Sequence, residues 1–135
     1  MNSNSDRKGL SLSIRGTVAK VRPHVQEAFK NQGFGVLTEI DVQATLHQKV
    51  GAEMDGYLIL GMCNPTLAHR AIQIDPNIGQ FLPCNVLLRQ DGDQVEVIAQ
   101  DPALMMQYSD SAGLEPIGLE ARTRIENAIS EIKTN

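Results

Sequence analysis

The sequence has no tryptophan, and its only aromatic residues are three phenylalanines and two tyrosines. So few rings cannot build a base-stacking platform or an aromatic cage. The 12 basic residues are scattered along the chain, and the 16 acidic residues give a net charge of -4. Because no basic patch is present to bind phosphate backbones, we expect no nucleic-acid partner.

Long apolar runs are also missing. A membrane span needs about 18 to 20 apolar residues in succession, and no segment approaches that length. Residues 1–8 are polar, without the apolar stretch of a secretory signal, and we expect them to be a disordered lead. We therefore expect a cytoplasmic protein with no membrane contact. In that compartment the only two cysteines, Cys63 and Cys84, should be reduced thiols.

Residues 9–135 alternate between strand and helix patterns joined by short connections. Residues 57–60 are apolar on both faces, as in a central strand, and Asn64 followed by Pro65 predicts the start of a helix. Residues 91–93 predict the turn of a hairpin. We predict a single compact α+β domain, with an antiparallel or mixed sheet of about five strands and helices packed on it.

The first and last helices differ in how clearly the sequence defines them. Apolar residues from Val18 to Phe29 have helical spacing, but Pro23 predicts either a start near Arg22 or a kink. Apolar residues at core spacing predict the last helix over residues 115–133.

Three motifs, taken together, resemble a known family. They are GFGVLTEID at residues 33–41, ILGMCNPTLA at 59–68 and LPCNV at 82–86. In this order and spacing, over residues 9–106, the chain resembles the "domain of unknown function 302" family of small bacterial and archaeal proteins. The resemblance implies an α+β domain, often a homodimer, with no agreed activity. It also implies that Asn64 and Pro65 matter more to the fold than the cysteines, which one branch of the family lacks.

Cys63 lies at the end of the predicted central strand, one residue before the helix cap Asn64. Unpaired amides and the positive end of a helix favour a reactive thiolate at such a position, and ligands often bind at strand ends. The alternative is that Cys63 is a small buried hydrophobe that completes the core.

Cys84 and Asn85 begin another predicted strand. If that strand neighbours the one ending at Cys63, both thiols lie at one end of the sheet and share a small polar pocket with Asn64 or Asn85. We therefore take Cys63, Asn64, Cys84 and Asn85 as the candidate ligand-binding residues. Spacing alone does not decide whether the two sulfurs come close enough for a reversible dithiol or a two-thiolate metal site.

Other site chemistry has weaker support in the sequence. His69 is a candidate third ligand for a metal bound by Cys63 and Cys84, but it has no recognised ligand spacing to either, and the sequence identifies no cofactor. Glu39 stands two residues before Asp41 on a predicted strand, where the two carboxylates could serve as a general acid and base. The ordinary alternative is that Asp41 caps a helix.

The leading functional hypothesis is a module that binds or senses a small ligand near the two cysteine–asparagine steps. The alternative is a thiol-dependent redox protein or enzyme that uses Cys63 with Cys84. A second alternative is a structural homodimer that acts through protein partners. We expect self-association in any case, because strands that are apolar on both faces need more cover than a few helices provide.

Overall fold

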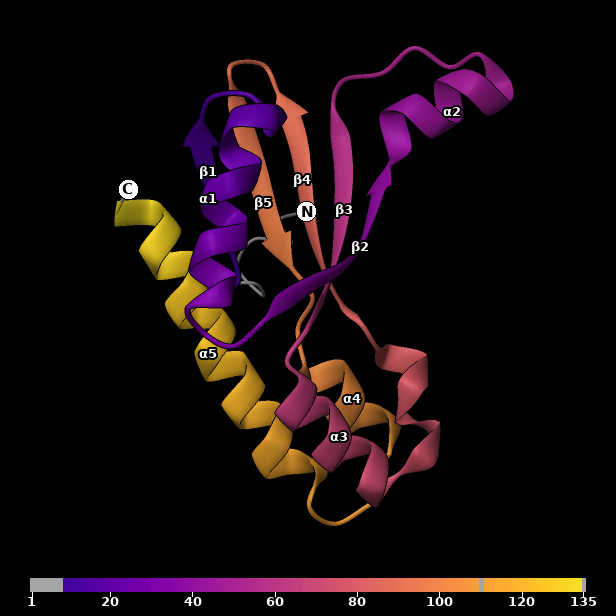
Figure 1. Ribbon diagram of the computed structural model, residues 1–135, viewed down its shortest axis with the longest axis vertical. Coiled ribbons are helices and arrows are strands. Elements are labelled where there is room, and N and C mark those ends of the chain that lie inside the picture. Colours follow the sequence, from indigo (N-terminus) through magenta and orange to yellow (C-terminus); the bar gives the residue numbers. More distant parts are fainter. Residues whose placement is uncertain (1–8, 110, 135) are drawn as a thin grey trace.

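The computed structural model describes residues 9–109 and 111–134 (Figure 1). The predicted disordered lead, residues 1–8, lies outside the described residues. The strands form one antiparallel sheet in the order β1-β5-β4-β3-β2, which confirms the predicted α+β class with five strands. Their bounds are β1 Ser11–Arg15, β2 Gly35–Asp41, β3 Tyr57–Cys63, β4 Cys84–Asp91 and β5 Gln94–Ala99.

Helices α1 and α5 pack on one face of the sheet, and α3, α4 and a short 3-10 helix gather below it, around the first half of α5 (Figure 1). No helix in the described part of the chain is long and apolar enough to cross a membrane. The helices are α1 Val18–Lys30, α2 Val42–Val50, α3 Pro65–Ile74, η2 Pro76–Phe81, α4 Ala103–Tyr108 and α5 Leu114–Thr134.

The start of α1 excludes one of the two alternatives that Pro23 predicts. The helix begins at Val18 rather than near Arg22 and includes Pro23 in its interior. Thr17 caps its first turn, because the side-chain oxygen accepts a hydrogen bond from the Lys20 amide at 3.3 Å. Pro23 lies on the exposed side, and the opposite side is buried. Burial of that apolar side outweighs the local cost of a proline within the helix.

The connection between β3 and α3 agrees with the prediction from residues 57–65. Strand β3 lies between β4 and β2, and its side chains at positions 58, 60 and 62 face the core. Asn64 then caps α3 through its side-chain oxygen, which accepts a hydrogen bond from the Leu67 amide at 3.2 Å. Pro65 takes the first helical position, where no amide hydrogen is needed.

Two hydrophobic clusters make up the interior. The main cluster lies between the sheet and helices α1 and α5, and its fully buried members include Phe29, Leu60, Met62, Leu88, Ile125 and Ile132. The second cluster joins α3, η2, α4 and the beginning of α5 through Leu67, Ala71, Ile78, Met105, Leu114 and Ile117. Helix α5 contributes to both clusters and so ties the lower helices to the sheet.

The later part of the β2–α2 arm, residues 35–50, extends away from both clusters, whereas Val36 near its start packs against the main cluster (Figure 1). Strand β2 is an edge of the sheet, and α2 has no buried residue. The arm exposes several large apolar side chains, of which Val50 and Leu37 are the most exposed, at 72% and 66%. The stability of this arm therefore comes mainly from its pairing with β3 rather than from core packing.

Candidate functional site

A cavity of about 60 Å³ lies where the two hydrophobic clusters meet. Both clusters contribute residues to its wall, as do the segments that follow β3 and β5. Apolar wall residues include Phe34, Met62, Leu67, Met105, Ile117 and Ile125. The site is therefore mainly apolar, which corrects the expectation of a small polar pocket.

Three of the four candidate ligand-binding residues line this cavity, namely Cys63, Asn64 and Cys84. Asn85 does not line it and is exposed. The reason is strand alternation: Cys84 pairs with Met62 and shares its face of the sheet, so the next residue points to the other face. The same alternation, applied to the sequence, would have separated Asn85 from Cys84.

The two cysteines are free thiols and do not lie near each other, although both contribute to the cavity wall. Cys84 is opposite Met62 in the sheet, and Cys63 is the next residue along β3, so its side chain leaves the strand in the other direction. The Cys84 thiol donates a weak hydrogen bond to the Gln100 carbonyl oxygen at 3.6 Å. Burial, with a smaller contribution from Asp101, raises the pKa of Cys84 to about 12, which keeps it a neutral thiol.

The weaker candidates are not part of the cavity. Glu39 forms an ion pair with Arg22 of α1 and also accepts a hydrogen bond from its Nε at 3.0 Å. Asp41 caps α2 by accepting a hydrogen bond from the Ala44 amide at 2.9 Å, as the ordinary alternative stated. His69 is exposed on α3. Within the described residues, no three His, Cys, Asp or Glu side chains gather closely enough to hold a metal ion.

Sequence reasoning missed two polar residues of the wall, Gln100 and Asp101. They follow β5, the neighbour of β4 in the sheet, and so reach the same end of it as Cys84. Asp101 accepts hydrogen bonds from the Ala103 amide at 2.9 Å and from Arg122 Nη1 at 2.8 Å. An Asp-Pro step before a short helix was visible in the sequence, but its contact with α5 was not.

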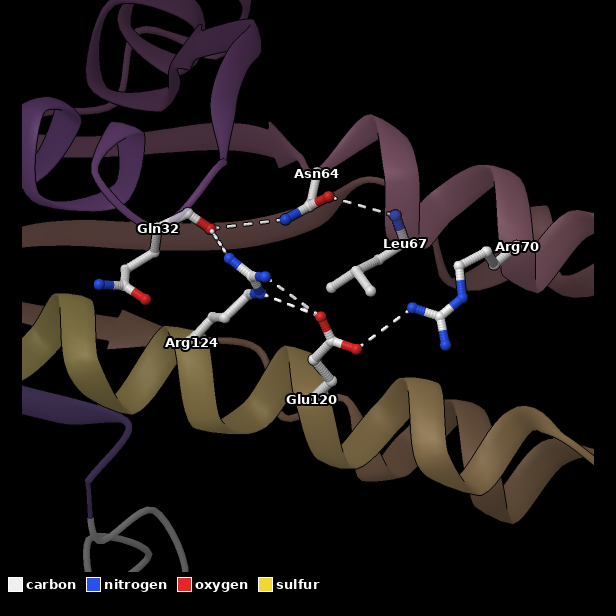
Figure 2. A network of polar contacts seen from close by, with 6 residues as sticks. All are labelled: Gln32, Asn64, Leu67, Arg70, Glu120 and Arg124. Atoms are coloured by element: carbon white, nitrogen blue, oxygen red, sulfur yellow. Dashed lines mark hydrogen bonds and ion pairs between the residues drawn. The ribbon is translucent and has the colours of Figure 1, made fainter.

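Asn64 also begins a network of polar contacts beside the cavity, shown in Figure 2. Its Nδ2 donates to the Gln32 carbonyl oxygen at 3.4 Å, and Arg124 Nη1 donates to the same oxygen at 3.2 Å. Arg124 also donates to Glu120 Oε2, whose other oxygen accepts from Arg70 Nη1 at 3.2 Å. The network thus joins the turn after α1, the start of α3 and the middle of α5.

Hydrogen bonds from Arg70 and Arg124 lower the pKa of Glu120 below its ordinary value of 4.5. The folded state therefore favours the ionised carboxylate more than the unfolded state does, and this stabilisation is present above pH 4.5. It is lost as the pH falls through the lowered pKa.

We expect Glu120→Gln to be less stable than the unmodified protein at pH 7 and to approach it in stability as the pH falls below 4.5. The difference arises because the glutamine cannot ionise and so gains nothing from the two arginines at neutral pH. Urea unfolding at a series of pH values measures the difference in the free energy of unfolding between the variant and the unmodified protein. Glu115→Gln, an exposed change in the first turn of the same helix, is the control, and an equal pH response of the two variants would contradict the prediction.

Fold and site together define a small α+β domain with an apolar cavity between two packed clusters. The chain belongs to the family described as "Domain of unknown function DUF302", which matches residues 10–132. It is also similar to the crystal structure of an uncharacterized conserved DUF302 protein from Bacillus stearothermophilus. The two are 23% identical with a TM-score of 0.82, over 90% of this chain and 94% of that one. No curated protein matches the chain.

Proposed function

We propose that the protein is a small-ligand binding or sensing module whose site is the cavity between the two hydrophobic clusters. The observation that carries the proposal is the cavity itself, about 60 Å³ in volume, with Cys63, Asn64 and Cys84 in its wall. The wall is mainly apolar, so an apolar group that enters the cavity would be removed from water and would gain contacts with side chains of both clusters.

A cavity-filling variant tests the proposal. Ala121→Leu adds bulk from α5 directly into the cavity, whereas Ala19→Leu makes the same change at an exposed position of α1. Native mass spectrometry of protein purified without added small molecules should detect a bound molecule in the unmodified protein and in Ala19→Leu, but not in Ala121→Leu. If all three are free of ligand, and no compound of a diverse panel raises the melting temperature in a way that Ala121→Leu removes, the proposal is wrong.

The thiol-dependent alternative is less well supported by the geometry. It needs two thiols that meet, or one that ionises readily, and Cys84 does neither. The free thiols remain compatible with a reducing cytoplasmic location, which we retain as part of the proposal.

We expect Cys84 in the folded protein to resist alkylation by iodoacetamide at pH 8. Raising the pKa from 9.0 to about 12 lowers the thiolate fraction about a thousandfold, and only the thiolate reacts. Mass spectrometry of the Cys63→Ser variant, in which Cys84 is the only thiol, measures the rate. The same variant in urea is the control and should react at the rate of an ordinary cysteine. Comparable rates in the folded and unfolded states would contradict the prediction.

We also propose that the protein is a homodimer that associates through the β2–α2 arm. The arm carries exposed Leu37, Ile40, Leu46 and Val50, and the outer edge of β2 has no partner strand among the described residues. An exposed edge strand with apolar side chains is a template for pairing, and identical edges can pair about a two-fold axis.

Light scattering at tens of micromolar tests the dimer. Leu37→Lys and Val50→Lys place charges on the arm and should convert a dimer to a monomer, while Leu119→Lys changes an exposed leucine on α5 as a control. A monomeric mass for the unmodified protein would reject this proposal without affecting that of the cavity.

A further inference from the structure

The polar groups at the cavity wall are already engaged with other parts of the protein. Asn64 uses its side-chain oxygen on the Leu67 amide and its nitrogen on the Gln32 carbonyl. Gln100 accepts from the Asn85 amide at 3.3 Å and donates to the Phe81 carbonyl at 3.5 Å. Among the described residues, no buried side-chain nitrogen or oxygen lacks a hydrogen-bond partner. The wall therefore offers an incoming polar group little that is not already in use.

Charge on a ligand is disfavoured for the same reason. Asp101 is the only acidic or basic residue of the wall, and its carboxylate is held by Arg122 and by the Ala103 amide. An anion would meet this carboxylate without a free cation to offset it. A cation would have to leave water and compete with Arg122 for Asp101, and desolvation of an ion is expensive without full compensation.

The volume of the cavity also limits the size of the ligand. The cavity leaves about 60 Å³ for the centres of water-sized spheres, so the volume of a molecule that fits is larger than this figure and allows a short alkyl group. A cavity of this size holds a group of a few carbon atoms rather than a large ligand, and apolar cavities accept apolar molecules.

We propose that the cavity binds the apolar end of an uncharged molecule, a short alkyl group or one of similar size. This proposal rests on the proposed function and adds the chemical class of the ligand. Affinity would come from contacts with the side chains of the two clusters, and the polar groups of the wall would keep their present partners.

Three compounds with the same four-carbon chain test the class: 1-butanol, butyrate and butylammonium. We expect 1-butanol to shift the NMR signals of wall methyl groups, such as those of Leu67 and Ile117, with a Kd at least about tenfold lower than that of either ion, a difference of 1.4 kcal/mol. Ala121→Leu should remove the response to 1-butanol, and Ala19→Leu should retain it.

The outcomes separate the two proposals. Equal binding of the ions, or tighter binding of one of them, with loss in Ala121→Leu would overturn the ligand class and leave the binding site standing. Suppose instead that a molecule bound during purification is absent from Ala121→Leu and that 1-butanol gives no response. This result would also overturn the ligand class and leave the binding site standing. A response to 1-butanol that Ala121→Leu does not change would place the binding elsewhere and overturn both proposals.

Discussion

Gly61→Ala is expected to destabilise the protein by about 1 to 3 kcal/mol, the range for overpacking an interior. A Cβ at Gly61 would collide with the hydroxyl oxygen of Thr38 on β2 and would lie 2.9 Å from Cγ of Pro83. The Pro83 ring cannot turn away, and Thr38 has a short, branched side chain. Glycine is thus required at position 61, where β2, β3 and the start of β4 approach one another at the end of the sheet next to the cavity.

Urea unfolding followed by circular dichroism measures the loss. Gly35→Ala is the matched control, since Gly35 is also a strand glycine, and no atom lies within 4 Å of a Cβ placed there. The control should be neutral or slightly stabilising because alanine restricts the unfolded chain. Equal stability of the two variants would show that Thr38 and Pro83 move aside at no cost.

Asn64→Ala should cost about 1 to 3 kcal/mol, because it removes two interactions together. Loss of a helix cap alone costs about 0.5 to 2 kcal/mol, and a buried hydrogen bond contributes about 1 kcal/mol more. The cap is the bond from the Leu67 amide, and the second interaction is the bond to the Gln32 carbonyl. Both bonds involve the side chain of Asn64, which is only 9% exposed, so water cannot readily replace the lost partners.

Two variants separate these contributions. Asn64→Ser retains a capping oxygen and loses the donor to Gln32, so it should lie between the unmodified protein and Asn64→Ala. Asp41→Ala removes the cap of the exposed helix α2 and should cost less than Asn64→Ala, because α2 buries no side chain. Unfolding in urea gives all four free energies. An Asp41→Ala loss as large as that of Asn64→Ala would mean that the network beside the cavity adds nothing.

Local signals predicted the elements that local chemistry determines. The Asn64-Pro65 step predicted the start of α3, and residues 91–93 predicted the β4–β5 turn, where Gly92 has a φ of +63° that favours glycine. The last helix was placed within a residue of its observed ends. Each of these depends on neighbours within a few positions.

The errors came from interactions between distant residues. Pro23 lies inside α1 because Val21, Val25 and Phe29 pack into the main cluster, and no local rule weighs that packing. The sequence predicts a polar pocket because an asparagine follows each cysteine. The α4 and α5 part of the wall, which includes Met105 and Ile125, is far from both cysteines in sequence, and nothing in its local pattern marks it as their neighbour.

Helix α5 has a consequence for the dynamics of the protein, because one continuous helix packs into both hydrophobic clusters. Leu114 and Ile117 in its first turns belong to the second cluster, and Ile125 and Ile132 in its later turns belong to the main cluster. Opening of the lower helices would free the first turns while the later ones remain folded. Amide hydrogen exchange along α5 should therefore change near Ala121, at the level of the cavity, and a molecule bound there would slow exchange in the first half of the helix more than in the second.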